Sequence, residues 1–364
     1  MANNPQSSAL YVGALGALLL MGGCKSIGPG SIKNARQEYN DAIARTSDEQ
    51  LLGNIVRMKH CESPCFMEVG EIIENRKWTA RIGPNLSKFG LASNAGKHEL
   101  GLTAYAEVFQ NPTIRYFPVK GEDFTKRMIS PIPVAVVLGL SQTGWDIRRV
   151  FSLCVERINR LDNASAASGP TPAQKPEYET FAEAIEQMAE LYEQNRLVIG
   201  LSSRNDLVLR FTDSNPQSQQ LKSILGVDPN SSEFHFGSNF LDASSTNLTV
   251  RTRSVMEVLF YLSHAVNVPQ KDIDAGLVMK TSDENGAIFD WSRHLSGEWI
   301  AINCTEGRQR PENAFVSVFY RRKWFFIADN DLNSKSTFIF LNYLFNLQSG
   351  NPKAFVPALT VSTS

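Results

Sequence analysis

Apolar residues recur at helical spacing in several parts of this chain, and each such stretch predicts an amphipathic helix. The clearest begins at Trp145 and continues to Leu161, with charged residues on the opposite side. A second is predicted over Glu177–Gln194, and the capping-box pattern Ser254-x-x-Glu257 predicts the start of a third. The apolar faces of the first and third helices hold Ile147, Phe151, Cys154, Val155, Ile158 and Leu161, and Val255, Val258, Leu259 and Leu262.

Two other stretches are predicted to be helical, and the second of them leaves two interpretations open. The pattern Ser47-x-x-Gln50 predicts a helix start before an apolar face that begins at Leu51, with Pro64 ending the helix. The segment Phe338–Leu347 is apolar except for two asparagines. A helix of this composition is either central to a core or lies against a partner.

Alternating or continuous apolar runs bounded by Gly and Asn predict strands, and their short separations indicate antiparallel pairing. The predicted strands are Phe66–Ile73, Lys77–Ile82, Glu99–Phe109, Thr113–Val119, Leu197–Leu201, Leu207–Phe211, Leu277–Thr281, Trp299–Asn303, Phe315–Tyr320 and Trp324–Ala328. Together these elements predict an α+β fold, with mixed, largely antiparallel sheets and packed amphipathic helices in two subdomains.

Residues 9–24 form an uncharged apolar run that ends in Gly22-Gly23-Cys24. A helix of this length is too short for a bilayer, which needs about 20 residues, but it fits the apolar core of a secretory signal peptide. The Gly-Gly-Cys end resembles the lipobox of bacterial lipoproteins, in which signal peptidase II cuts before the cysteine. The resemblance implies that Cys24 carries the lipid, and Lys25 after it favours the outer membrane, with the body facing the periplasm.

These observations predict a domain plan with one internal boundary. Residues 1–23 are the signal peptide, and residues 24–35 are the lipidated cysteine and a tether. Low-complexity residues 163–176 are a flexible linker or loop between an N-terminal subdomain at 36–162 and a C-terminal subdomain at 177–350. Residues 351–364 are an extended tail.

The formal net charge of -1 excludes nucleic-acid binding as an expectation, because no basic surplus is present to displace counterions from phosphates. No apolar run of about 20 residues follows Cys24, so the lipid on Cys24 is the predicted membrane attachment, with a protein of the envelope as a possible partner. Cys61 and Cys65 flank a short Glu-Ser-Pro segment, so a small disulfide loop is an open alternative in an oxidising compartment. Cys154 lies on a helical apolar stripe and is expected to be buried.

No motif predicts catalytic, cofactor-binding or metal-binding residues. Gly90 to His98 lacks the spacing and the Ser or Thr of a phosphate-binding loop, and Gly139 to Gly144 is one residue too long for a nucleophile elbow. Asp329-x-Asp331 is read as a turn and helix cap rather than a cation site. The five histidines, His60, His98, His235, His264 and His294, show no ligand spacing.

Three segments resemble a group of uncharacterised lipoproteins from Gram-negative bacteria, in which similar blocks follow the lipidated cysteine. The segments are Glu38–Val69, Pro112–Leu161 and Phe315–Gln348. The resemblance covers about a third of the chain and departs from the group at Cys61 and Cys65. The group carries no assigned activity, so the resemblance implies localisation and no catalytic residues.

Three functions are compatible with this sequence. The first is an outer-membrane lipoprotein with a non-catalytic scaffolding or assembly role in the cell envelope. The second is a lipoprotein that binds a small molecule or a cell-wall polymer in a pocket lined by aromatic residues, namely Trp291, Trp299, Tyr320 and Trp324. The third is an envelope hydrolase whose active site is assembled from dispersed residues. The sequence favours the first.

Overall fold

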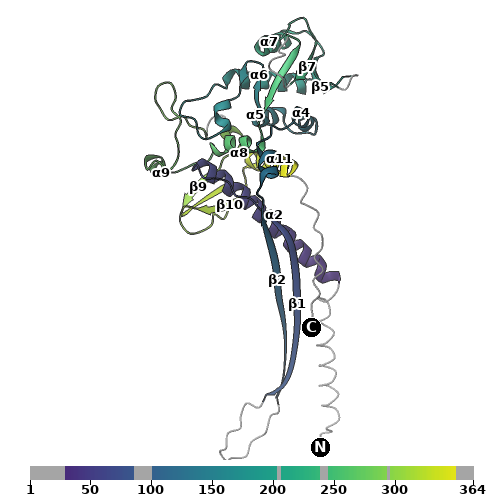
Figure 1. The fold of residues 1–364 in the computed structure, drawn as a ribbon, viewed down its shortest axis with the longest axis vertical. Coiled ribbons are helices and arrows are strands. Elements are labelled where there is room, and N and C mark those ends of the chain that lie inside the picture. Colours follow the sequence, from purple (N-terminus) through teal and green to yellow (C-terminus); the bar gives the residue numbers. More distant parts are fainter. Residues whose placement is uncertain (1–28, 86–100, 203–205, 238–244, 293–295, 350–364) are drawn as a thin grey trace, which may run out of the picture. The chain divides into compact units, whose positions relative to one another are not determined.

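The computed structural model describes residues 29–85, 101–202, 206–237, 245–292 and 296–349 (Figure 1). The described residues form helices and several sheets that are largely antiparallel, which confirms the predicted α+β class. The chain separates into two compact units, one formed by residues 65–119 and the other by residues 1–64 together with 120–364. This division differs from the boundary at 163–176 that composition predicts, because those residues lie inside the larger unit.

The smaller unit is one long antiparallel hairpin. Strand β1 (Met67–Asn85) pairs with β2 (Gly101–Pro118), and one β-bulge lies between Val69 and Glu71. The sequence predicted four short strands here. The structure joins them in pairs, because the polar residues expected to separate them remain in the ladder, where Asn75 lies opposite Asn111.

The larger unit contains a six-stranded sheet in the order β4–β3–β8–β7–β6–β5. All neighbouring strands are antiparallel except β7 and β8. The strands are β3 (Val155–Ile158), β4 (Leu161–Asp162), β5 (Leu197–Leu201), β6 (Leu207–Phe211), β7 (Glu233–Gly237) and β8 (Asn247–Thr252). The sheet therefore combines residues from both sides of the expected 163–176 linker.

The larger unit also contains helices and a second, three-stranded sheet. The helices are α2 (Pro29–Lys59), α3 (Glu122–Ile129), α4 (Val134–Gln142), α5 (Ile147–Cys154), the 3₁₀ turn η2 (Ser165–Ser168), α6 (Glu179–Glu193), α7 (Pro216–Leu225), α8 (Val255–Ser263), α9 (Gln270–Asp274), α10 (Ser296–Trp299) and α11 (Leu332–Ser349). Local signals define some of these ends. The predicted capping box of α8 forms, with Ser254 and Glu257 each bonding the other's backbone.

Two predicted helices differ from the observed ones. The stripe from Trp145 to Leu161 is divided, because α5 ends at Cys154 and Val155 begins β3, which pairs with β8. The Ser47-x-x-Gln50 pattern lies inside α2 and does not start it. Helix α2 ends at Lys59, before the expected Pro64, and left-handed Cys61 (φ 58°) follows. The Glu62 amide donates to the Arg57 carbonyl at 2.9 Å.

The second sheet has the order β10–β11–β9 and includes two of the predicted strands. Its strands are β9 (Asn303–Glu306), β10 (Ala314–Tyr320) and β11 (Lys323–Ala328). Residues Leu277–Thr281 were predicted as a strand and are irregular, and Trp299 ends α10 instead of opening a strand. The β10–β11 turn consists of Arg321 (φ 47°) and Arg322 (φ 66°), both left-handed.

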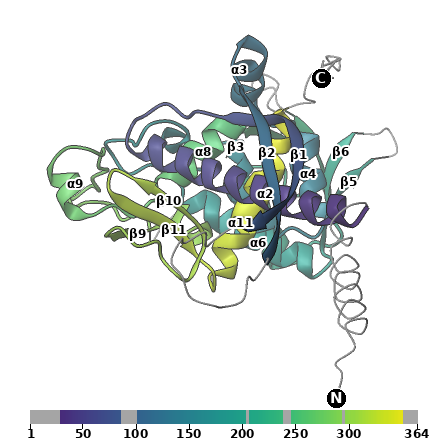
Figure 2. The same cartoon turned by 90° about the horizontal axis from the view of Figure 1, so that it is seen from below.

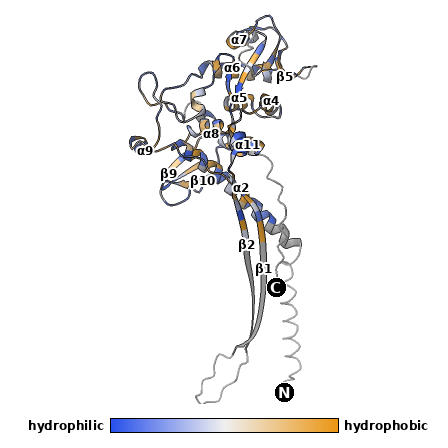
Figure 3. Cartoon of the chain, in the orientation of Figure 1, coloured by the Kyte–Doolittle hydropathy of each residue, from blue (hydrophilic) through white to orange (hydrophobic). Residues whose placement is uncertain are grey.

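Helix α8 is central to the core of the larger unit. It packs against α2, α3, α5, α10, α11 and η2, and Figure 2 shows it beside α2. Leu259 and Leu262 of α8 and Leu52 and Ile55 of α2 are fully buried. Apolar residues, orange in Figure 3, are frequent along these helices. The buried polar residues described next lie at the two ends of α8.

Candidate functional site

Arg253 joins the end of β8 to the cap of α8, and its side chain is completely buried. Its guanidinium donates through Nε to the Ser168 hydroxyl at 3.0 Å. It also donates to four backbone carbonyls, those of Ser152, Leu153, Val155 and Asn163. The planar fork of five N–H groups suits this role, since one side chain can serve acceptors in several directions. Arg253 thereby fastens η2 and the α5–β3 junction to α8.

The charge of Arg253 is held among neutral acceptors and an aromatic ring. Its guanidinium carbon lies 4.2 Å from the centroid of the Tyr261 ring, a cation–π contact. Burial lowers the pKa of Arg253 and raises the pKa of Tyr261, because removal from water disfavours both charged forms. The interior therefore favours a neutral phenol at Tyr261 beside the guanidinium cation of Arg253.

His264 follows the other end of α8 and is equally enclosed. Its Nε2 lies 3.0 Å from the Ala167 carbonyl and its Nδ1 lies 3.3 Å from the Thr171 hydroxyl. The ring also packs on Trp291 with centroids 4.6 Å apart. Burial, assisted by the nearby positive charge of Lys59, lowers the pKa of His264 to about 3. His264 is therefore neutral at physiological pH.

Lys59, the last residue of α2, reaches the same region. Its Nζ donates to the His264 carbonyl at 3.4 Å, and its side chain is 6% exposed. Burial lowers the pKa of Lys59 to about 8. The long hydrogen bond and the lowered pKa indicate an ammonium group that is only partly compensated in this interior.

A third buried group lies where α9 meets β11. Lys323 forms an ion pair with Asp272, and both side chains are largely enclosed. Burial raises the pKa of the neighbouring Cys304 thiol to about 11. His60 donates through Nδ1–H to the Val56 carbonyl, 2.9 Å away, while its Nε2 is buried without a hydrogen-bond partner. The rings of Tyr320 and Phe325 pack edge-on against His60.

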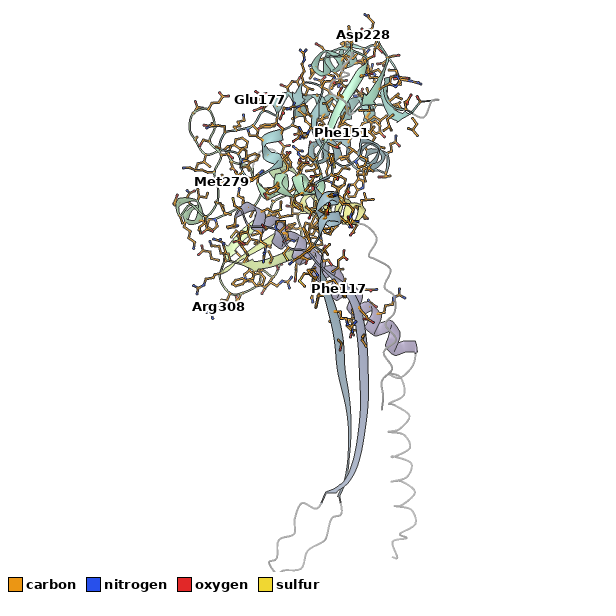
Figure 4. The ribbon with its side chains drawn as sticks, viewed as in Figure 1. Phe117, Phe151, Glu177, Asp228, Met279 and Arg308 are labelled. Atoms are coloured by element: carbon orange, nitrogen blue, oxygen red, sulfur yellow. The ribbon has the colours of Figure 1, made fainter. Side chains whose placement is uncertain are left out.

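None of these groups has the chemistry of a working catalytic pair. Thr171 and His264 have the residue types of a nucleophile and a base, but an imidazole with a pKa near 3 is a weak base at neutral pH. Thr171 is also 5% exposed, so a substrate has no access to its hydroxyl. Cys304 is held as a neutral thiol instead of the reactive thiolate. Figure 4 shows side chains filling the larger unit, including the enclosed Phe151.

The other residues considered from the sequence take structural positions. Ser141 of the Gly139–Gly144 segment lies within α4 and donates to the Leu138 carbonyl, so no nucleophile elbow forms. Asp331 accepts from the Ser334 amide at 3.0 Å, as a helix cap does, and Lys335 pairs with Asp329. This confirms the turn-and-cap interpretation.

The four aromatic residues proposed for a pocket lie in separate contacts. Trp291 is 5% exposed and donates its indole N–H to the Thr281 hydroxyl at 2.9 Å. Trp324 packs on Phe319 of the β10–β11 hairpin, and Arg149 lies over the Trp299 ring. Tyr320 contacts His60.

Several predicted positions lie outside the described residues, namely Cys24, the Gly90–His98 segment and His294. Cys154 is buried as expected, and burial raises its pKa to about 12. Cys61 carries a free thiol at the surface and thus forms no disulfide with Cys65. His235 is exposed on β7.

Within the described ranges, no three His, Cys, Asp or Glu side chains are grouped as metal ligands, and no helix is long and apolar enough to cross a membrane. Comparison of the chain with protein-family models, with curated proteins and with solved structures finds no match. The buried polar groups at the ends of α8 are the feature that sequence reasoning missed. Their partners are distant in sequence, and an isolated arginine before a capped helix gives no local signal.

Proposed function

We propose that this chain is a lipoprotein anchored to the outer membrane through acyl chains on Cys24, with a non-catalytic assembly role in the cell envelope. The anchor is supported by the apolar run and Gly22-Gly23-Cys24. More than one acyl chain makes such an anchor stable, since a single chain binds a membrane only marginally. The body would then face the periplasm.

The assembly role is supported mainly by one exposed apolar stripe on α11. Ile339, Tyr343 and Leu347 are 43%, 53% and 59% exposed, and their spacing of four residues puts them on one side of the helix. Phe340 and Leu344 on the same helix are buried in the core. Helix α11 thus has two apolar sides, and apolar side chains gathered on a surface are typical of protein contacts.

The buried titratable groups are consistent with a non-catalytic role. Arg253 and His264 are engaged with backbone carbonyls and aromatic rings, so their polar atoms stabilise the fold. Strongly shifted pKa values are typical of active sites, but they arise equally in enclosed structural networks. Here the enclosure is nearly complete, because the exposed fractions of these two side chains are 0% and 2%.

The anchor is tested by metabolic labelling with palmitate. The wild-type chain is expected to incorporate label and to sediment with outer membranes, while Cys24→Ser is expected to lose both properties. Label that persists in Cys24→Ser would contradict lipid attachment at this residue.

The assembly role is tested by chemical cross-linking in native membranes followed by purification of the tagged chain. Ile339→Glu is expected to abolish the cross-linked partner band. Val198→Glu is the matched control, because Val198 is an exposed apolar residue on β5, 47% exposed and on another element. Equal partner recovery from both variants and the wild type would exclude the α11 stripe as the contact.

A further inference from the structure

The hairpin β1–β2 has two outer edges that pair with no further strand in the part of the chain described here. The edges extend over 19 residues of β1 and 18 residues of β2. Each edge presents a row of backbone N–H and C=O groups that can pair with another strand. A single two-stranded hairpin is only marginally stable in water, so a hairpin of this length calls for further strands.

The residue types indicate that the half of the hairpin next to residues 86–100 has two unlike faces. Alternate residues of a strand lie on opposite faces, and directly paired residues share a face. On β1 one face takes the apolar residues Trp78, Ala80, Ile82 and Pro84. Each is paired with an apolar residue of β2, from Val108 opposite Trp78 to Leu102 opposite Pro84. The other face of β1 takes Lys77, Thr79 and Arg81, and their partners on β2 are Phe109, Glu107 and Tyr105, so this face is mainly polar with two aromatic residues.

The length of this two-faced segment fits the thickness of a bilayer. It extends from Lys77 to Asn85 on β1, and the register pairs it with Gly101–Phe109 on β2. A tilted strand that crosses the hydrocarbon layer needs about 9 to 11 residues, with apolar residues at every second position. The apolar face ends before Trp78, because the two preceding positions on the same face of β1 are Arg76 and Glu74.

The two edges of one hairpin are complementary to each other. Because β1 and β2 are antiparallel, β1 of one copy placed beside β2 of another continues the same antiparallel pattern. Glu71 of β1 and Arg115 of β2 form a cross-strand ion pair at 3.3 Å within the hairpin. Ile114 and Tyr116 are 39% and 55% exposed, so apolar surface remains to be covered.

We infer that several copies of this chain join their hairpins edge to edge in a closed ring, and that the segment Lys77–Asn85 with Gly101–Phe109 enters a lipid bilayer. Every backbone polar group in hydrocarbon must be paired, so one hairpin alone cannot enter, whereas ring closure leaves no open edge. The apolar face meets acyl chains, and the polar face lines a passage for small polar solutes. This function goes beyond anchoring and assembly.

The test uses the full-length chain in phosphatidylethanolamine–phosphatidylglycerol vesicles that contain a small fluorescent dye. The wild-type chain is expected to release dye and to migrate as an oligomer in mild detergent. Ala80→Lys places a charge on the lipid-facing side and is expected to slow release by about tenfold or more. Thr79→Lys, one residue away on the other face, is expected to keep release within about twofold of wild type, since polar residues are tolerated there.

The controls separate this inference from the proposed anchor and from misfolding. Circular dichroism checks that both lysine variants fold, and Ala106→Lys on β2, paired with Ala80, provides an independent second variant. Cys24→Ser is expected to retain dye release in vesicles, because insertion depends on the hairpin and not on the lipid. A monomeric wild-type chain that releases no dye, or equal release from the wild type, Ala80→Lys and Thr79→Lys, would overturn the inference.

Discussion

The guanidinium of Arg253 lies over the ring of Tyr261 while its N–H groups bond carbonyls of the α5–β3 junction and of Asn163. One side chain therefore joins α8, strand β3 and η2. Both members of the pair are buried, so the contact is not weakened by water.

Replacing Arg253 by Lys is expected to destabilise the fold. A single ammonium cannot serve five acceptors in different directions, so buried carbonyls lose their donors at a cost of about 3 kcal/mol in the free energy of unfolding. Urea unfolding measures this change. Arg210→Lys is the control, because Arg210 is an exposed partner of Glu233 and is expected to change stability by less than about 0.5 kcal/mol. Equal effects would show that the carbonyl network contributes little.

His264 is expected to make stability pH-dependent. In the unfolded chain its pKa is about 6.5, whereas burial lowers the pKa of the folded state to about 3. Between these values the unfolded chain binds the additional proton, so stability falls as pH decreases below about 6.5, by at most about 1.4 kcal/mol per pH unit. Urea unfolding at pH 7 and pH 5 should show a smaller difference for His264→Gln than for the wild type. An unchanged difference would contradict the burial of a neutral imidazole.

Lys59→Met is expected to stabilise the chain at pH 7, because burial lowers the pKa of Lys59 to about 8 and its charge is poorly compensated. Replacing such a group by an apolar one of similar length is expected to add about 1–2 kcal/mol. The free energy of unfolding of the wild type should increase as pH rises from about 8 towards 10.5, because in this range the folded lysine is neutral and the unfolded one is still charged. The gain should thus shrink at pH 10. A loss of stability at pH 7 would indicate that the bond to the His264 carbonyl dominates.

The β10–β11 turn stores strain that a glycine should relieve. Two-residue hairpin turns with positive φ at both positions favour Asn-Gly, but this chain has Arg321 and Arg322 there. Arg322→Gly is expected to raise the free energy of unfolding by about 0.5–1 kcal/mol, since a left-handed non-glycine residue costs of the order of 1 kcal/mol or more. Arg322→Ala removes the same side chain without relieving the strain, and should give no gain. Thermal unfolding of both variants distinguishes the two causes.

The cysteines should differ in their rate of alkylation. Cys61 is exposed, whereas burial raises the pKa values of Cys154 and Cys304 to about 12 and about 11. Because the thiolate is the reactive form, iodoacetamide at pH 7.5 should modify exposed Cys61 first in the native chain. Cys304, which is partly exposed, should react more slowly, and buried Cys154 only after unfolding. Peptide mass spectrometry identifies the sites. Native labelling of Cys304 as fast as that of Cys61 would contradict the raised pKa of its thiol.

Elements with local signals were predictable from the sequence. The Ser254 capping box, the β5–β6 hairpin and the β10–β11 hairpin depend on residues a few positions apart, and all three form where expected. The helix predicted over Glu177–Gln194 is present as α6, within two residues at each end.

Elements that depend on distant partners were not predictable. Val155 and Ile158 continue a helical stripe, but pairing with β8 makes them a strand. The buried polar groups of the candidate site could not be predicted for the same reason. For example, the Ser152 carbonyl that accepts from Arg253 lies 101 residues earlier in the chain. Periodicity reports one element at a time and carries no information about such contacts.

The strand order of the larger sheet has a consequence for the order of events during synthesis. Strand β3 pairs with both β4 and β8. In the chain, however, α6, α7 and strands β5 to β7 separate β3 and β4 from β8. A chain made from its N-terminus therefore cannot close this sheet, or cover Leu52 and Ile55 of α2, until α8 has emerged. Until then the nascent chain exposes the apolar face of α2, which makes it sensitive to proteolysis and prone to aggregation. We expect such a chain to need a chaperone that holds it unfolded.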